Sequence, residues 1–241
     1  MAKRFTRGVV TLAGTLLGFG TAGLMLAGSA GASVNTSNTA GYMAGNGHWN
    51  FRYVASTILV PENACGSDDF VASGVELSGT LSSASVAVAC NNGAPEVFWG
   101  MTSLNQVANG GLNVHGDDLI KLSLYYNQTT GYDNFYAHDL TTGATDVWAH
   151  KAGVAQYIHA AAATVVNNPL LYPPSPGTSY ILVKNTSTEV TSTNGTHGAG
   201  INGPWGAAQR MQAMNGAHVI ANAPNLFENG QGFDVRVYGN S

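Results

Sequence analysis

An all-β fold, a sandwich or a barrel, is what this sequence predicts, on three observations. Turn-forming pairs that contain Gly and Asn recur at short intervals from residue 45 to residue 230. Short runs rich in β-branched and aromatic residues lie between them, and several runs alternate apolar with polar side chains. This spacing is typical of many short strands rather than of alternating strands and helices. We find no internal repeat and no linker, and we expect a single domain over residues 33–241.

Three segments have the two-residue period of a half-buried strand most clearly. They are residues 51–60, 119–125 and 233–238. In the first, one face is expected to carry Phe51, Tyr53, Ala55, Thr57 and Leu59. In the second, Ile120, Leu122 and Leu124 are expected to be buried while the intervening side chains face water.

Residues 154–166 are harder to assign, because their alanines also suit a helix. We expect a strand over the first half, since Tyr157 and Ile158 favour β-structure and no N-cap residue precedes them. Residues 167–178 contain four prolines and are expected to form a loop.

The N-terminus indicates export. A basic start, with Lys3, Arg4 and Arg7, precedes an apolar run from residue 9 to about residue 26, and small residues follow. Ala30 and Ala32 fit the cleavage rule, so we expect a signal peptide over residues 1–32 and a secreted, extracellular product of a bacterium. The alternative is a retained anchor, but glycines interrupt the apolar run. No later segment reaches the length of a transmembrane helix, so no membrane partner is expected for the mature form.

Charge and cysteine content narrow the class of protein further. Three of the nine basic residues precede residue 33, so six basic residues stand against 13 acidic ones in the mature part, a formal net charge of −7. The six are scattered, which argues against a nucleic-acid partner. Cys65 and Cys90 form an even pair in an oxidising compartment and are expected to make a disulfide, with two free thiols as the alternative.

Several sequence blocks, in their order and spacing, resemble the glutamic endopeptidase (eqolisin) family, especially its bacterial members. They are residues 40–42, 51–54, 60–61, 94–99, 116–120, 125–127, 139–143, 195–198, 204–205 and 232–235, together with the two cysteines. The resemblance spans nearly the whole mature chain. It implies a concanavalin-like, double-sheet β-sandwich. It also implies chemistry in which a glutamate activates water and a glutamine amide stabilises the oxyanion, without metal or cofactor.

The residues required for that chemistry are absent from the matching positions. The family's Ala-Glu-Trp-Ile-Val-Glu strand corresponds to residues 155–160, where Gln156 and Ala160 occupy the two acidic positions and Tyr157 that of the tryptophan. The glutamine is expected shortly before the second cysteine, yet residues 83–89 contain no amide side chain. The acidic residue expected after Trp99 is also absent. We therefore assign no catalytic residue, and we expect a divergent relative without peptidase activity.

Other constellations remain open. Glu76 and Glu96 lie on expected strands and offer two carboxyls for a hydrolase, although each is also well explained as a solvated strand residue. The pairs Asp117-Asp118 and His138-Asp139 adjoin turn signals, and we expect turn chemistry there and no metal site. The aromatic residues either fill the core or form a stacking platform for sugar or peptide. They are Trp49, Trp99, Trp148, Trp205 and the tyrosines of residues 125–126 and 132–136.

The functional expectation is a secreted binding protein, monomeric and without cofactor, that holds peptide or glycan in the cleft of an eqolisin-like sandwich. The residues expected to line that cleft are Gln156, Tyr157, Trp99, Glu96 and Glu76. The alternative is a divergent secreted acid peptidase or a glycan-active hydrolase.

Overall fold

The computed structural model describes residues 33–45, 48–66, 69–80, 83–101, 106–152, 156–170, 172–198, 200–227 and 231–239. Within these ranges the regular structure consists of strands alone. The expected signal peptide, residues 1–32, lies outside the described residues. Nowhere in the described ranges does a helix occur with the length and apolar character needed to cross a bilayer.

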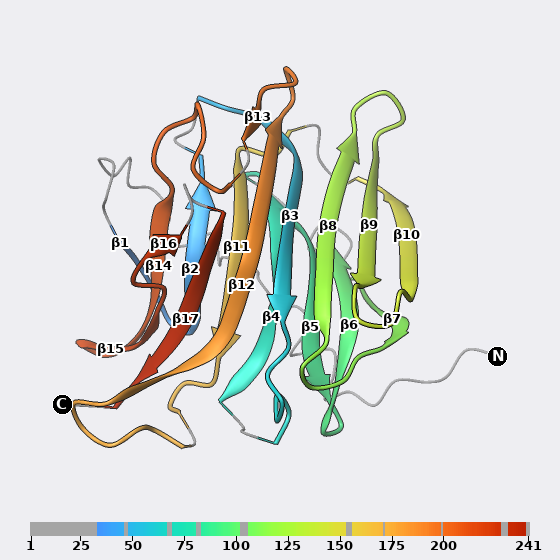
Figure 1. Cartoon of the computed structure of the whole chain (residues 1–241). Coiled ribbons are helices and arrows are strands. Elements are labelled where there is room, and N and C mark those ends of the chain that lie inside the picture. Colours follow the sequence, from blue (N-terminus) through green and yellow to red (C-terminus); the bar gives the residue numbers. More distant parts are fainter. Residues whose placement is uncertain are drawn as a thin grey trace.

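The strands form two layers that face each other as a β-sandwich (Figure 1). Each layer is named here after one of its strands. In the β4 layer, antiparallel neighbours follow the order β7 (Gln106–Asn113), β6 (Ala94–Met101), β5 (Ser83–Asn91), β4 (Phe70–Ser78), β11 (His159–Val166), β2 (Thr39–Ala44), β14 (Gln209–Asn215). In the β8 layer, the order is β10 (Thr145–Lys151), β9 (Tyr132–Asp139), β8 (Leu119–Asn127), β3 (Phe51–Leu59), β12 (Ser179–Ser192), β17 (Gly232–Tyr238).

Short strands complete the edges. β1 (Ser33–Thr36) pairs in parallel with β14, β13 (His197–Gly198) pairs with β12, and β16 (Leu226–Phe227) pairs with β17. β15 (His218–Asn222) pairs with both β14 and β17, so it joins the two layers at one side of the sandwich.

The alternation of the sequence explains which side chains fill the space between the layers. On β8, Ile120, Leu122 and Leu124 are fully buried in this interior, as expected, while Lys121 and Tyr125 are only half-buried on the opposite face. β3 departs from strict alternation. Its pairing with β12 advances two residues on β3 for one on β12, so Arg52 is an extra residue that turns Phe51 inward. Phe51 therefore does not share a face with Tyr53, contrary to the expectation.

The alanine-rich segment is a strand, but not over the half that was expected. Residues 153–155 lie outside the described ranges, Tyr157 makes only an isolated bridge to Phe51, and β11 begins at His159. β11 is central, because β4 and β2 both pair with it. Backbone pairing on both sides and burial of every residue after His159 outweigh the helix propensity of alanine.

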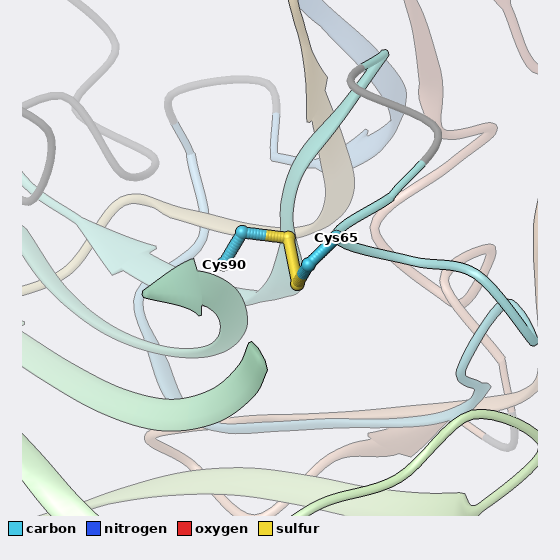
Figure 2. Close-up of a disulfide and its surroundings, with 2 residues drawn as sticks. All are labelled: Cys65 and Cys90. Atoms are coloured by element: carbon cyan, nitrogen blue, oxygen red, sulfur yellow. A yellow bond between two sulfur atoms is a disulfide. The ribbon is translucent and has the colours of Figure 1, made fainter. Parts of the chain in front are cut away.

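The two cysteines are bonded, as expected (Figure 2). Cys65 lies in the turn region after β3, and Cys90 lies near the end of β5, 25 residues further along the chain. Closing a loop of this length stabilises the folded chain by about 3–4 kcal/mol in the chain-entropy model.

The proline-rich connection from β11 to β12 is a loop in its described residues, as expected. It is held by Asp69, a fully buried residue just before β4. The two carboxylate oxygens of Asp69 accept hydrogen bonds from the Tyr172 backbone N–H (3.2 Å) and the Tyr180 hydroxyl (2.6 Å).

Candidate functional site

The candidate site lies on the outer face of the β4 layer, the face that points away from the β8 layer. Directly opposite residues of antiparallel strands share a face. Val75, Leu77 and Ala160 belong to the interior between the layers, whereas Ala87 and Ala161 belong to a second buried cluster on the other face. Three successive rows across β5, β4 and β11 on this outer face are Ser83–Ser78–His159, Ser85–Glu76–Ala161 and Ala87–Gly74–Ala163. Small side chains therefore surround one carboxyl.

Glu76 is that carboxyl, and its environment is unusual. Its side chain is 1% exposed, and neither Oε1 nor Oε2 has a hydrogen-bond partner of normal geometry among the described residues. Burial raises the pKa of Glu76 well above its ordinary value, and the nearby hydroxyls of Ser78 and Ser83 offset this only in part. Burial therefore favours the protonated, neutral form of this carboxyl. The expectation of a solvated strand residue is wrong for Glu76.

The positions at which the family would carry its two acidic residues do not lie on this face. Gln156 is exposed and precedes β11, outside the strand. Ala160 is opposite Leu77 and fully buried in the interior. Between Ser83 and Ala89, the outer face of β5 carries only hydroxyls and methyls. No amide or second carboxyl therefore faces Glu76 from the neighbouring stretches of β5 and β11.

Glu96 lies on the same face but far from Glu76. The residue opposite Glu96 on β5 is Ala89, and the residue opposite Glu76 is Ser85. Four residues along a strand span about 13 Å, which exceeds the carboxyl separations that glycosidases use. Glu96 instead accepts hydrogen bonds from the side-chain amides of Asn91 (3.0 Å) and Asn109. The two glutamates do not form a catalytic pair.

Tyr157 faces the interior rather than a cleft. It is 1% exposed, packs edge-to-face on Tyr126, and donates a 2.6 Å hydrogen bond from its hydroxyl to Oδ2 of Asp133. Burial raises the pKa of Asp133 to about 6, while the Tyr157 hydrogen bond and the positive charge of His150 oppose that rise. Burial also raises the pKa of Tyr157, and the charges of Asp133, Tyr126 and Glu76 add to it.

Trp99 also points inward, away from the face of Glu76. Its ring lies 5.3 Å from that of Phe135 and 6.0 Å from that of His150, measured between centroids. The Trp99 Nε1–H and Oδ1 of Asp133 are both buried without a hydrogen-bond partner among the described residues. Of the five residues expected in one cleft, only Glu76 and Glu96 share the outer face of the β4 layer.

A cavity of about 310 Å³ adjoins the outer-face cluster at the far end of β11. Its lining includes Val71 and Val165, which pack with that cluster, and the polar residues Asn38, Asn167 and Asn168. Val165 is opposite Ala72, four residues along β4 from Glu76. The cavity therefore opens onto the same face as the carboxyl.

The sequence analysis missed two buried titratable residues. Asp133 lies in the interior between the layers, and His159 lies on the outer face of the β4 layer. Asp133 occupies the inward phase of β9 together with Phe135 and Ala137, and a charged residue in an apolar phase was the available signal. His159 lies opposite Ser78, and burial lowers the pKa of its imidazole, partly offset by the Ala44 carbonyl. Its Nδ1 has no hydrogen-bond partner among the described residues.

The acidic residues for which a metal site was considered stabilise turns instead. Asp118 accepts a 2.7 Å hydrogen bond from the His115 backbone N–H, and Asp139 accepts hydrogen bonds from the backbone N–H groups of Thr141 and Thr142. Within the described residues, no group of three or more His, Cys, Asp or Glu gathers as metal ligands would.

The two-layer fold is the double-sheet sandwich seen in solved glutamic peptidases. The structure is similar to scytalidoglutamic peptidase, solved with a peptide-based transition-state analogue, at a TM-score of 0.62 and 15% identity over 83% of this chain and 97% of that one. It is also similar to SCP-B, described as a member of the eqolisin family and solved with the tripeptide Ala-Ile-His, at a TM-score of 0.56, 15% identity and coverages of 84% and 98%. No family model and no curated protein sequence matches the chain. The chain therefore has the eqolisin fold, as expected from the sequence.

Proposed function

We propose that this chain is an exported, eqolisin-fold protein that binds peptide along the outer face of the β4 layer and does not hydrolyse it. The observation that supports the proposal is the burial of Glu76, whose direct neighbours Ser85 on β5 and Ala161 on β11 carry neither a carboxyl nor an amide. The exported product is proposed to begin at Ser33.

The proton affinity of Glu76 argues against hydrolysis. A general base must be ionised at the working pH in order to take a proton from water. Burial raises the pKa of Glu76 and so disfavours its ionised form, and its cross-strand neighbours Ser85 and Ala161 offer no second acid or base to share a water molecule. A neutral carboxyl instead donates a hydrogen bond, as buried carboxylic acids do in sites that bind carbonyl oxygens. Because the Glu76 side chain is 1% exposed, a peptide reaches it only when the side chains that cover this face move aside.

The case for a peptide ligand rests on the shape and chemistry of the face. The row of Glu76 and the row of Val165 are four residues apart, about 13 Å, which matches an extended peptide of about four residues. The asparagines that line the cavity at the Val165 end provide donors and acceptors suited to peptide groups. Two proteins with this fold have been solved with peptidic molecules, as their descriptions state.

Peptide binding is tested with the protein that begins at Ser33 and a library of fluorescent peptides at pH 4, followed by fluorescence anisotropy. We expect binding that weakens at least tenfold in Glu76→Ala. Glu96→Ala is the matched control, since Glu96 is a carboxyl on the same face about 13 Å away along the strands. Equal loss in both variants, or no binding by the wild type, contradicts the proposal.

The alternative function is a divergent hydrolase that uses Glu76 as a general acid. A buried carboxyl with a raised pKa is typical of catalytic acids, which favours this alternative. It requires a second group to activate water on the same face. Turnover of a peptide or glycan substrate that disappears in Glu76→Gln, with binding retained, would establish it.

A further inference from the structure

The outer face of the β8 layer carries four tyrosines as one patch, called here the tyrosine platform: Tyr53, Tyr125, Tyr132 and Tyr136. Tyr125 lies at its centre. It is directly opposite Tyr53 of β3, and it is diagonal to Tyr132 and Tyr136, which flank its β9 partner Asn134. Side chains in direct and diagonal positions are about 5 Å and 7–8 Å apart, so the four rings form a continuous surface. β3, β8 and β9 lie side by side in Figure 1.

The platform faces solvent rather than the core. Tyr132 and Tyr136 are 42% and 37% exposed, and the neighbouring Val147 of β10 is 52% exposed. The side chains that point inward from the same strands, Tyr126 and Phe135, are buried in the interior. The other two members of the platform, Tyr53 and Tyr125, are half-buried.

Polar uncharged groups frame the rings. Asn134 is fixed between them, because its side-chain amide donates to the backbone carbonyls of Tyr125 (3.2 Å) and Tyr132 (3.3 Å). Ser123, opposite Tyr136, adds a hydroxyl. Rigid tyrosines beside small polar side chains give large contact area at low conformational cost, together with adaptable hydrogen bonding.

The charge around the platform limits the class of ligand that it can bind. Three charged residues adjoin the platform: Lys121, Glu189 and Lys151, the last directly opposite Tyr132 on β10. Lys121 and Glu189 form an ion pair at 3.3 Å, and Glu189 also accepts a 3.4 Å hydrogen bond from Tyr53. The charges of the ion pair cancel, and Lys151 leaves one positive charge at the Tyr132 end of the platform, while the chain from residue 33 onward has a formal net charge of −7. An anionic polymer is repelled by that charge, and a neutral one is not.

The backbone hydrogen bonding of the platform strands favours a sugar ligand over a peptide. β8 pairs with both β3 and β9, so its backbone groups are engaged in the sheet and no edge is open for an added peptide strand. The face offers mainly ring surfaces and hydroxyls, beside the Asn134 amide, the Lys121–Glu189 ion pair and Lys151. Pyranose rings present an apolar C–H face and peripheral hydroxyls, which complement such a surface.

We propose that the tyrosine platform is a binding surface for a neutral polysaccharide of pyranose units. It is separate from the face of Glu76, because it lies on the outer face of the other layer. The polysaccharide spans Tyr132 to Tyr136, about 13 Å along β9, and thus several sugar rings. In this arrangement the platform holds the protein on a glycan surface.

The test uses the product that a bacterial host exports from the full chain, incubated with insoluble cellulose, chitin and β-1,3-glucan, and the unbound fraction is measured. We expect retention on at least one of these polymers, and at least a tenfold weaker affinity for it in the double variant Tyr132→Ala/Tyr136→Ala. Tyr172→Ala is the matched control, because Tyr172 is a more exposed tyrosine (63%) in the loop before β12, outside the platform. Polygalacturonate is the anionic comparison, and we expect no retention on it.

Because both substituted tyrosines are exposed, we expect the double variant to keep the thermal midpoint of the wild type within a few degrees. If it does not fold, the single variants Tyr132→Ala and Tyr136→Ala take its place. Failure of the wild type to bind any of the three neutral polymers overturns the proposal, as does retention that is unchanged in the platform variants. Glu76→Ala is expected to leave retention unchanged, so this result is independent of the outcome of the peptide experiment.

Discussion

Glu76 of β4 and Ala161 of β11 lie directly opposite each other on the outer face of the β4 layer, a carboxyl facing a methyl group. On the other side, Glu76 faces Ser85 of β5. Burial raises the pKa of an acid that has no ionic partner and favours its protonated form, which is why this face suits hydrogen-bond donation better than water activation.

The first prediction concerns the pH dependence of stability. Because the pKa of Glu76 is raised in the folded state, the folded chain retains a proton that the unfolded chain releases as the pH rises above about 4.5. Stability due to Glu76 is therefore complete at low pH and is lost as the pH rises. Glu76→Gln is expected to remove this loss, so its urea midpoint exceeds that of the wild type at pH 8. Curves that stay parallel from pH 4 to pH 8 would contradict this.

The second prediction concerns Asp133, whose pKa is raised from 3.8 to about 6. The same sign applies: wild-type stability falls between pH 4 and pH 6, by up to about 3 kcal/mol at 1.36 kcal/mol per unit. Asp133→Asn still accepts the Tyr157 hydrogen bond and is expected to flatten this region of the profile. Urea unfolding at pH 4, 5, 6 and 7 measures the free energy of unfolding of both proteins. If this free energy falls with pH as steeply in the variant as in the wild type, the buried Asp133 carboxyl is not the cause.

Third, Tyr157→Phe removes the only donor that reaches Oδ2 of Asp133 among the described residues. Leaving a buried acceptor without a donor costs about 1–3 kcal/mol. We expect the loss to be larger at pH 8 than at pH 4, because the ionised carboxylate depends more on the donor. Tyr126→Phe is the control, since it keeps the ring contact with Tyr157. Similar losses in the two variants would show that ring packing, and not the hydrogen bond, is responsible.

Fourth, Gly74 lets β5 approach β4 closely in the row beside Glu76. A Cβ at Gly74 would lie 2.1 Å from the Val86 carbonyl oxygen, a backbone atom that cannot move aside cheaply. Gly74→Ala is expected to destabilise the protein by at least about 1–3 kcal/mol, as overpacking does. Thermal unfolding measures the loss, with Ser85→Ala on the same face as the control. A midpoint within 2 °C of the wild type, roughly the measurement error for such a change, would contradict the close approach.

The sequence predicted the all-β class, the disulfide and the strands around residues 119–125 and 233–238, because two-residue alternation and turn residues are local signals. It did not predict where β11 begins. Alanine has no strand preference of its own, so the pairing with β2 and β4 determines the first residue of the strand. The inward turn of Phe51 was also missed, because the extra residue Arg52 is visible only in the register with β12.

The candidate site was harder to predict than the fold. Trp99 and Glu96 were expected in one cleft, but they lie on opposite faces of β6, as their odd spacing along a strand requires. The two-residue period does not reveal which face of each strand points between the layers. Tyr157 was expected in a cleft and lies inside, because the chain crosses there to pair with Phe51 of the other layer. The burial of Glu76 depends on neighbours from β5 and β11, which only the register identifies.

Acid proteolysis tests the central claim most directly. Purified protein beginning at Ser33 is incubated with casein and with a peptide pool at pH 3–4, and new N-termini are counted by mass spectrometry, with Glu76→Gln alongside. We expect no cleavage above the buffer control in either sample. Cleavage by the wild type that vanishes in Glu76→Gln would contradict it, because the buried acid would then be taking part in water attack.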